Sequence, residues 1–319
     1  MHTSTTIAVL GLMLALSIAF RSESLSIGGE ELRPRYKLPF LVALRNATQG
    51  SKICGGSIYS KRVIITAKHC MMDEAGNVDD LEHLDVGVGC HRFDDCIEAY
   101  HIDKFEVLDN LYLRHDIMLL HTNRDIAFGE FRDPYNQTRR IGRIGLGAAP
   151  DQKDSRGLLP QVDYNKETKE ILGMTGWGFI DRKQTTTKVP REVFMQVKSH
   201  DQCLKEFEKG EYVSEENICA GSPDGVVCQG DSGSPVYRMR DERFELVGVV
   251  QGGNSADDDC GKSASLIEKI SFYSKWIEEV AAKWRGLDPV DLEPTETKVR
   301  MTPVEVDELA LSANVRRSY

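Results

Sequence analysis

The sequence lacks an excess of positive charge. Its 319 residues include 40 lysines and arginines against 50 aspartates and glutamates, which gives a formal net charge of -10 at pH 7. Nucleic acids and anionic membrane surfaces attract basic proteins, so this balance argues against either as a main partner. The charge leaves the nature of any substrate open.

Long hydrophobic runs are also scarce. Residues 7–20 are almost all apolar and end in small residues, but a helix that spans a bilayer needs about 20 apolar residues. We interpret residues 1–21 as a signal peptide. A buried amino-terminal helix is the weaker alternative, because the run starts near the first residue and stops at Arg21. No second run follows, so we expect a soluble, secreted, extracellular protein without a membrane partner.

Internal repeats are not visible, and helical periodicity is confined to residues 201–209 and 274–284, where Ser274 is a candidate cap. Elsewhere short β-branched runs alternate with turn residues; they are residues 40–44, 63–66, 84–88, 117–120 and 244–250. This alternation of short apolar runs and turn residues predicts an all-β protein.

Eight cysteines, an even number, favour a disulfide framework. Asn46 and Asn136 each open an acceptor sequence for N-glycosylation, and both features agree with secretion through an oxidising compartment. The polar stretch 147–171 is interpreted as a surface insertion. The acidic, proline-containing stretch 286–319 is expected to be a disordered tail.

The octapeptide Cys228-Gln229-Gly230-Asp231-Ser232-Gly233-Ser234-Pro235 is the stretch most suited to chemistry. A serine between small residues fits a nucleophile on a tight turn that must approach a carbonyl group. Clusters of Gly, Ser, Asp and Pro are nevertheless turn signals first, and most such serines are ordinary loop serines. The nucleophile hypothesis therefore needs a base and an acid elsewhere.

Two upstream residues meet that need. His69 ends the apolar run Ile64-Ile65-Thr66-Ala67 and precedes Cys70, which would pin its loop. Asp116 opens the apolar run Ile117-Met118-Leu119-Leu120, where a carboxylate is costly unless something hydrogen-bonds to it. An imidazole is the expected partner, although a lone histidine is more often structural.

In these contexts the order His69, Asp116, Ser232 resembles the trypsin-like (chymotrypsin-fold) serine peptidase family, and it differs from the orders found in α/β-hydrolases and subtilisins. The resemblance runs from about residue 26 to 283. It includes Cys54-Gly55-Gly56-Ser57, Thr175-Gly176-Trp177-Gly178 and Trp276-Ile277.

The resemblance implies two packed antiparallel six-stranded β-barrels with a C-terminal helix. Residues 26–285 would form this peptidase domain, with the barrel boundary near 134–143 and a short propeptide at 22–25. A monomer without cofactor or metal is expected. Its partners would be protein or peptide substrates, and protein inhibitors form a second candidate class.

The resemblance also implies disulfides between Cys54 and Cys70, Cys203 and Cys219, and Cys228 and Cys260. Cys90 and Cys96 remain, in a loop where many relatives bind calcium, and a short disulfide between them would replace the metal. The rival hypothesis is a zinc site made of Cys90, His91, Asp94, Asp95 and Cys96.

In the implied mechanism Ser232 attacks a peptide carbonyl, His69 transfers the proton and Asp116 fixes the imidazole tautomer. The amides of Gly230 and Ser232 would hold the oxyanion. Asp231 would pair with an α-amino group created at Ser26 or Ile27, although Leu25 is not the basic residue that a trypsin-like activator prefers.

Three departures from the family pattern bear on activity. Lys68 replaces a small residue, Ser234 replaces a glycine, and Gln251-Gly252-Gly253 stands where relatives have a serine, a tryptophan and a glycine. Two hypotheses therefore stay open: an active secreted serine endopeptidase, and a protease-like binding or inhibitory protein with impaired catalysis.

The primary pocket that the resemblance implies has Val226 at its floor, with Gln251, Gly252, Gly253 and Ser265 around it. A valine floor offers no carboxylate to a substrate arginine or lysine, and an unpaired buried cation is costly. We therefore expect cleavage after medium apolar residues. Asp224 and residues 257–259 would act at the rim, on flanking subsites.

Overall fold

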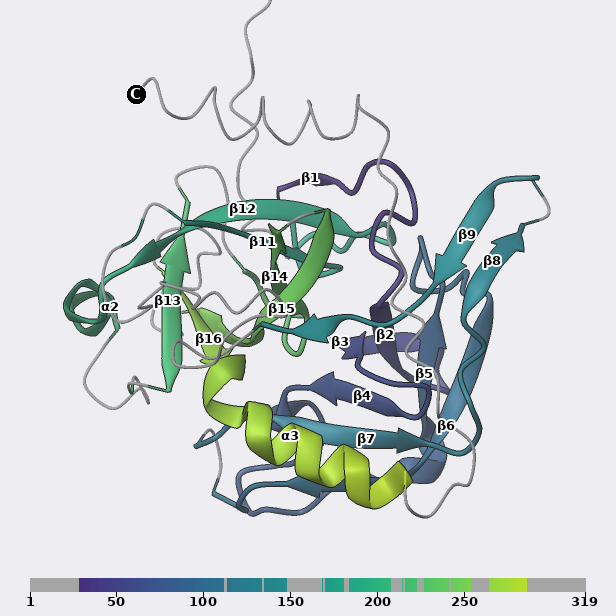
Figure 1. The fold of residues 1–319 in the computed structure, drawn as a ribbon, viewed down its shortest axis with the longest axis horizontal. Coiled ribbons are helices and arrows are strands. Elements are labelled where there is room, and N and C mark those ends of the chain that lie inside the picture. Colours follow the sequence, from purple (N-terminus) through teal and green to yellow (C-terminus); the bar gives the residue numbers. More distant parts are fainter. Residues whose placement is uncertain are drawn as a thin grey trace, which may run out of the picture.

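The computed structural model describes residues 29–111, 114–133, 135–147, 168, 170–180, 184–207, 214, 216–222, 227–240, 242–253 and 264–285. They form two closed six-stranded antiparallel barrels, packed side by side, and a C-terminal helix (Figure 1). The predicted all-β fold class is confirmed.

The first barrel is built from the β-branched runs that the sequence analysis singled out. In spatial order its strands are β2 (Leu41–Asn46), β3 (Ser51–Ile58), β4 (Val63–Thr66), β7 (Met118–Thr122), β6 (Glu98–Val107) and β5 (Leu84–Val88), and β5 closes on β2. Short 3-10 helices, η1 (Lys68–Cys70) and η2 (Leu81–His83), follow β4 and precede β5. Every residue of β4, β5 and β7 is buried, which explains their apolar sequences.

The second barrel follows along the chain. Its strands, in spatial order, are β12 (Arg191–Lys198), β11 (Ile171–Gly176), β14 (Pro235–Arg240), β15 (Arg243–Gly253), β16 (Ser265–Lys269) and β13 (Asn217–Gly221), and β13 closes on β12. β1 (Glu30–Glu31) pairs with β12, and β10 (Gly145–Leu146) pairs with β15. The hairpin of β8 (Gly129–Arg132) and β9 (Thr138–Ile141) lies between the two barrels in the sequence.

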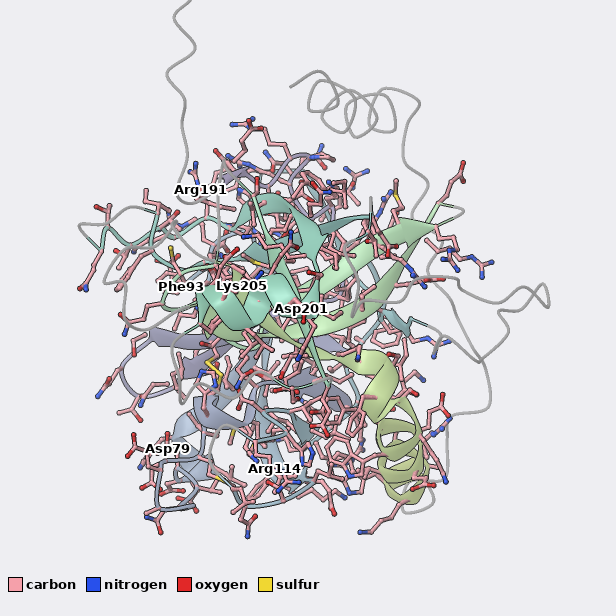
Figure 2. All side chains as sticks on the ribbon, turned by 90° about the vertical axis from the view of Figure 1, so that its left-hand side faces the viewer. Asp79, Phe93, Arg114, Arg191, Asp201 and Lys205 are labelled. Carbon is pink, nitrogen blue, oxygen red and sulfur yellow. A yellow bond between two sulfur atoms is a disulfide. The ribbon has the colours of Figure 1, made fainter. Side chains whose placement is uncertain are left out.

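Helix α2 (His200–Glu206) projects from the second barrel, and its exposed Asp201 and Lys205 face the viewer in Figure 2. Ser199 caps it by accepting a hydrogen bond from the amide of Gln202, whose side chain in turn accepts from the amide of Ser199. The helix starts one residue before the predicted stretch and ends at Glu206, while residues 208–213 lie outside the described residues.

Helix α3 (Ile270–Arg285) corrects one prediction. Ser274 does not cap it, because strand β16 leads directly into the helix at Ile270 and the Ser274 hydroxyl donates to the carbonyl of Ser271. The helix lies beside β7 of the first barrel (Figure 1), and its Trp284 meets His121 edge to face at 5.3 Å. It thereby ties the C-terminal half of the chain to the first barrel.

Three of the four expected disulfides are present: Cys54–Cys70, Cys90–Cys96 and Cys203–Cys219. Cys228 is also disulfide-bonded, and its expected partner Cys260 lies outside the described residues.

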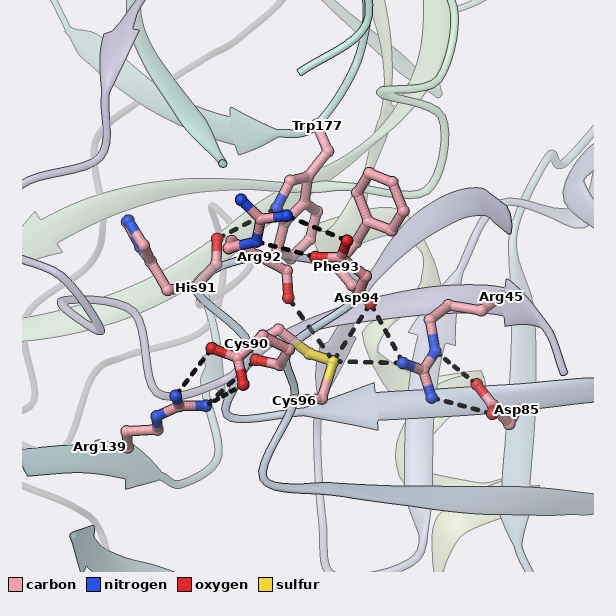
Figure 3. Close-up of a disulfide and its surroundings, with 11 residues drawn as sticks. Arg45, Asp85, Cys90, His91, Arg92, Phe93, Asp94, Cys96, Arg139 and Trp177 are labelled. Atoms are coloured by element: carbon pink, nitrogen blue, oxygen red, sulfur yellow. Dashed lines mark hydrogen bonds and ion pairs between the residues drawn. A yellow bond between two sulfur atoms is a disulfide. The ribbon is translucent and has the colours of Figure 1, made fainter. Parts of the chain in front are cut away.

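The Cys90–Cys96 bridge lies between two arginine ion pairs, Arg139 with Asp95 and Arg45 with Asp85 (Figure 3). The zinc hypothesis is wrong, because both sulfurs are joined to each other and Asp94 pairs with Arg92 and Lys188 instead. The bridge and the ion pairs hold this loop together.

Several predictions fall outside the described residues: the signal peptide, the propeptide with Leu25, Ser26 and Ile27, most of the surface insertion, and the tail. Among the described residues, no helix is both long and apolar enough to cross a membrane. Both predicted glycosylation sites are described: Asn46 is half-buried at the end of β2 and Asn136 is exposed.

Candidate active site

His69 lies in η1, directly after the buried strand β4. Its neighbour Cys70 is bonded to Cys54 of β3, which fixes the turn to the barrel wall. The His69 amide donates to Oδ1 of Asp116 at 2.8 Å, and its ring Nδ1 lies 2.6 Å from Oδ2 of the same carboxylate. The two predicted residues therefore meet through both backbone and side chain.

Asp116 is fully buried and His69 is half-buried. Burial lowers the pKa of His69, but the charge of Asp116 and the hydrogen bond to it raise this pKa, and the net direction is upward. A carboxylate on Nδ1 fixes the tautomer that leaves Nε2 free to accept a proton. The pair is suited to general base catalysis.

Lys68, a departure from the family pattern, is 1% exposed although it carries a charge. Its Nζ atom donates to the backbone oxygens of Asp109, Leu111 and Arg114 and to the Asp109 carboxylate, at 2.6–3.1 Å. The ammonium group therefore holds the segment that leads into Asp116. The sequence showed this lysine as an anomaly, but not its partners.

The loop around Ser232 docks onto the first barrel. The Gly55 amide of β3 donates to the Ser232 carbonyl at 2.8 Å, and the Gly233 amide donates to Val250 at 2.8 Å. Gly233 has a φ of +75°, and a Cβ atom there would lie 2.5 Å from the Gly55 carbonyl oxygen, so the close approach requires glycine. Gly55 follows Cys54, so the Ser232 loop and the His69 turn share one anchor.

Within the described residues, the Ser232 hydroxyl is not hydrogen-bonded to His69, so the structure brings His69 and Asp116 together and places the Ser232 loop on the same barrel wall. Contacts between nucleophile and base are often loose in proteins without substrate.

Gly230 supplies one of the two amides expected to bind an oxyanion. Its φ is +93°, a conformation that glycine adopts without strain, and its carbonyl accepts a hydrogen bond from Nζ of Lys52 in β3. Burial lowers the pKa of Lys52 to about 8, partly offset by the charge of Asp231. Sequence reasoning missed Lys52, which lies 178 residues away from Gly230.

Asp231 lies in a small pocket of the second barrel, which is lined also by Met174, Gly176, Gly178, Phe179, Arg191 and Val193. Its carboxylate accepts from the amides of Gly178 at 2.7 Å and Cys228 at 3.0 Å. Burial raises its pKa, and the two amides and the charge of Lys52 offset this only in part. The pocket therefore favours a further positive group.

The amino-terminal end of the described chain reaches the same pocket. Gly29 pairs its carbonyl with the guanidinium of Arg191, a residue of the pocket lining, and β1 continues from there along β12. Gly29, the first residue that the structure describes, is therefore joined through Arg191 to the pocket that contains Asp231.

The predicted specificity pocket is described in part. Val226 and Asp224 lie outside the described residues, as do residues 257–259. Ser265 is buried, and its hydroxyl accepts from the amide of Val227 at 3.3 Å. Among the described residues, a Cβ atom at Gly252 would meet nothing within 4 Å. Gln251 is buried and accepts from Asn217 at 3.4 Å.

Glu268 was missed by sequence reasoning. It is 2% exposed in β16, and its Oε1 accepts from the backbone amide of Asp116 at 3.1 Å. A glutamate in the run Ser265-Leu266-Ile267-Glu268 could have been flagged by the argument used for Asp116, since a carboxyl group in an apolar strand needs partners.

Among the described residues, Cys54, His69 and Cys70 lie close enough together to suggest a metal site, but the two sulfurs form a disulfide. His69, Asp116 and the Ser232 loop converge on one anchor at β3, an arrangement suited to covalent catalysis by a serine.

Comparisons with known proteins agree with this geometry. A sequence model of the trypsin family matches residues 26–277. The chain is 27% identical to the clotting factor G beta subunit of Tachypleus tridentatus over 80% of its own length and 79% of that protein. It is 28% identical to the proclotting enzyme of the same organism, over 79% of this chain and 65% of that protein. It is 26% identical to chymotrypsin-C of Rattus norvegicus, over 79% and 87% respectively.

Proposed function

The chain belongs to the trypsin family, and on that premise we propose that it is a secreted serine endopeptidase that forms an acyl-enzyme on Ser232. The observation that carries the proposal is the double hydrogen bond between His69 and the buried Asp116, at 2.6 and 2.8 Å. The relatives named clotting factor, proclotting enzyme and chymotrypsin support a peptidase that acts on proteins.

In the proposed reaction Ser232 Oγ attacks the peptide carbonyl while Nε2 of His69 takes its proton. The carbonyl oxygen becomes an oxyanion that the amides of Gly230 and Ser232 bind. Collapse breaks the C–N bond, and the imidazolium gives its proton to the leaving amine. Water then attacks the ester with His69 again as base, and free Ser232 is restored.

Activation would create an α-amino group at Ser26 or Ile27. Gly29 is held at the pocket of Asp231, and the two residues that precede it in a chain beginning at Ile27 span at most about 7 Å. The new cation would pair with Asp231, whose burial favours such a partner. Amino-terminal sequencing of active protein tests this, and a start at Ser22 would refute it.

The primary specificity would be apolar, with Val226 at the pocket floor and the open side at Gly252 and Gly253. We expect a peptide library to be cut after leucine, methionine or valine. A dominant cut after arginine or lysine would show that this assignment of the pocket is wrong.

The remaining properties follow from the same proposal. The protein would be a secreted monomer, glycosylated at Asn46 and Asn136, with protein or peptide substrates, and protein inhibitors would be further partners. It would act without a cofactor, a metal, a nucleic acid or a membrane.

Covalent labelling tests the proposed activity. The matured protein should react with a fluorophosphonate probe and hydrolyse casein, and Ser232→Ala should do neither while being secreted normally. A folded, correctly processed protein that is not labelled would instead be the protease-like binding or inhibitory protein.

A further inference from the structure

The carboxyl group of Glu268 is buried where four elements meet. Oε1 accepts from the Asp116 amide, just before β7, and from Nδ2 of Asn217 in β13 at 3.3 Å. Oε2 accepts from the hydroxyl of Tyr273 in α3. Both oxygens of this β16 side chain are thus used, and one of them holds the residue that orients the base.

Gln251 of β15 joins this arrangement. Its side-chain oxygen accepts from Nδ2 of Asn217, which also donates to Glu268. The chain from Gln251 through Asn217 and Glu268 therefore reaches Asp116 at its backbone.

The hydrogen bond from the Asp116 amide to Glu268 constrains Asp116, because its backbone and its carboxylate are then held by different partners. Its carboxylate binds His69 at two points, and its amide is fixed by Glu268. Loss of the contact with Glu268 would leave the buried amide of Asp116 without a hydrogen-bond acceptor and would allow the beginning of β7 to shift. A displacement of about 1 Å at a catalytic group can reduce a rate by about 10²-fold.

We propose that Glu268 is a positioning residue for the catalytic site: by fixing the backbone amide of Asp116 it sets the place from which that carboxylate orients His69. This inference deepens the proposed function and rests on it.

The charge of Glu268 would act on the same pair. The titratable groups that face it are Asp116 at the start of β7, Glu216 before β13 and Tyr273 of α3, while His115 contacts Glu216 and His69 lies beyond Asp116. Burial, and then the charges of Asp116 and Glu216, raise the pKa of Glu268 to about 7, although hydrogen bonds from Tyr273 and from the Asp116 amide lower it.

Below pH 7 the neutral carboxyl can still accept from the Asp116 amide through Oε1. Above pH 7 ionisation places a second negative charge beside Asp116, which stabilises protonated His69. Glu268 thus couples the position of the acid to the basicity of the base.

Three variants separate these effects. Glu268→Gln keeps an oxygen for the Asp116 amide and a donor for Tyr273, so kcat at pH 6 should stay within about threefold of wild type. The acid limb of kcat/KM should move to lower pH, because the second charge is gone. Glu268→Ala removes the acceptor of the Asp116 amide and should lower kcat by about 10- to 100-fold with KM nearly unchanged. The control Glu216→Gln removes a nearby charge that does not touch Asp116 and should leave kcat within about twofold.

A second readout does not depend on hydrolysis. The proton between Nδ1 of His69 and Asp116 should give a far-downfield NMR signal, which Glu268→Gln keeps and Glu268→Ala loses or shifts upfield. If wild type shows the signal but is not labelled by a fluorophosphonate, the proposed function fails while the positioning role is still decided by the signal.

The proposal is overturned if Glu268→Ala keeps both the signal and kcat. If Glu268→Ala does not fold, Glu268→Met decides, because it keeps a similar volume but has no oxygen for the Asp116 amide. Loss of the downfield signal and of kcat supports the proposal, and wild-type values of both overturn it.

Discussion

The two barrels contribute unequal halves of the candidate active site. In the first barrel Asp116 binds His69 twice, and buried Lys68 donates to four oxygen atoms. In the second barrel the carboxylate of Asp231 accepts two amide hydrogen bonds, yet its pKa is still raised by burial. Asp116 and Lys68 of the first half are each paired, whereas the Asp231 carboxylate of the second half favours an additional cation.

On the proposed function, this contrast explains how the precursor of a peptidase would be folded and still inactive. The His69 and Asp116 pair would need no later event, whereas the Ser232 loop, built around the under-compensated carboxylate of Asp231, would respond to a new amino group. Lys52 offsets part of that charge and also holds the Gly230 carbonyl. The regulated half would be the one that carries Ser232 and the oxyanion amides.

The largest effects should come from removing the proposed catalytic side chains of either barrel. Ser232→Ala, His69→Ala and Asp116→Ala should each reduce kcat by about 10⁴- to 10⁶-fold, because the three groups act as a unit. Double variants should be hardly worse than single ones. Additive losses, measured with one peptide substrate and matched folding controls, would mean that the two halves do not form one site.

Asp231→Asn should disturb the Ser232 loop of the second barrel and leave the His69 and Asp116 pair intact. Without its charge the carboxamide cannot hold an α-amino group, so the oxyanion amides would lose their positions and kcat would fall by about 10²- to 10³-fold. The downfield proton of the His69 and Asp116 pair should persist. Asp94→Asn, at an exposed residue of the loop between Cys90 and Cys96, is the matched control and should keep full activity. Loss of the downfield proton in Asp231→Asn would show that the halves are not separable.

Lys68→Met should weaken the segment of the first barrel that leads into Asp116. The variant leaves buried oxygens of the 109–114 segment without their donor, so we expect a loss of about 3 kcal/mol in the free energy of unfolding and of about tenfold in kcat. Lys275→Met is the control, because that side chain is 88% exposed. Equal stability of the two variants in urea denaturation would contradict the role given to Lys68.

The smallest effect on activity, but a clear one on stability, should come from Glu268→Gln. The folded pKa of about 7 exceeds the ordinary 4.5, so the folded protein holds a proton that the unfolded chain releases between these values. This contribution to stability is therefore fully present below pH 4.5 and is lost as the pH rises through 7. Relative to wild type, the variant should gain up to about 3 kcal/mol between pH 4 and pH 8 in urea denaturation. A constant difference across this range would contradict the raised pKa.

The fold could be predicted where the determinants are local. The apolar runs at 63–66 and 84–88 coincide with β4 and β5, because short β-branched segments between turns have few other stable arrangements. The start of α3 was misplaced, since β16 passes into the helix without a capping sequence and Ser274 looked like the nearest cap. The packing of that helix on the first barrel, more than a local signal, fixes where it begins.

Of the candidate site, the sequence predicted the proposed catalytic side chains but not the residues that hold them in place. His69 and Asp116 meet as expected, but the residues that hold the site do so over long separations: Glu268 reaches Asp116 across 152 residues, Lys52 reaches Gly230 across 178, and Lys68 reaches Asp109 across 41. Periodicity and spacing report neighbours along the chain, so they mark such residues as anomalies at most. Val226 adds a further limit, because its place in the pocket comes from the resemblance alone.

We propose that the chain is a serine peptidase whose base, His69, is held in place by its own barrel and whose Ser232 loop depends on a new amino terminus. The most direct test is the stoichiometry of fluorophosphonate labelling at Ser232, measured by intact mass before and after cleavage that exposes Ser26 or Ile27. We predict little labelling before cleavage, close to one probe per chain afterwards, and none in Ser232→Ala. Equal labelling before and after cleavage, or none in the cleaved protein, would contradict the account.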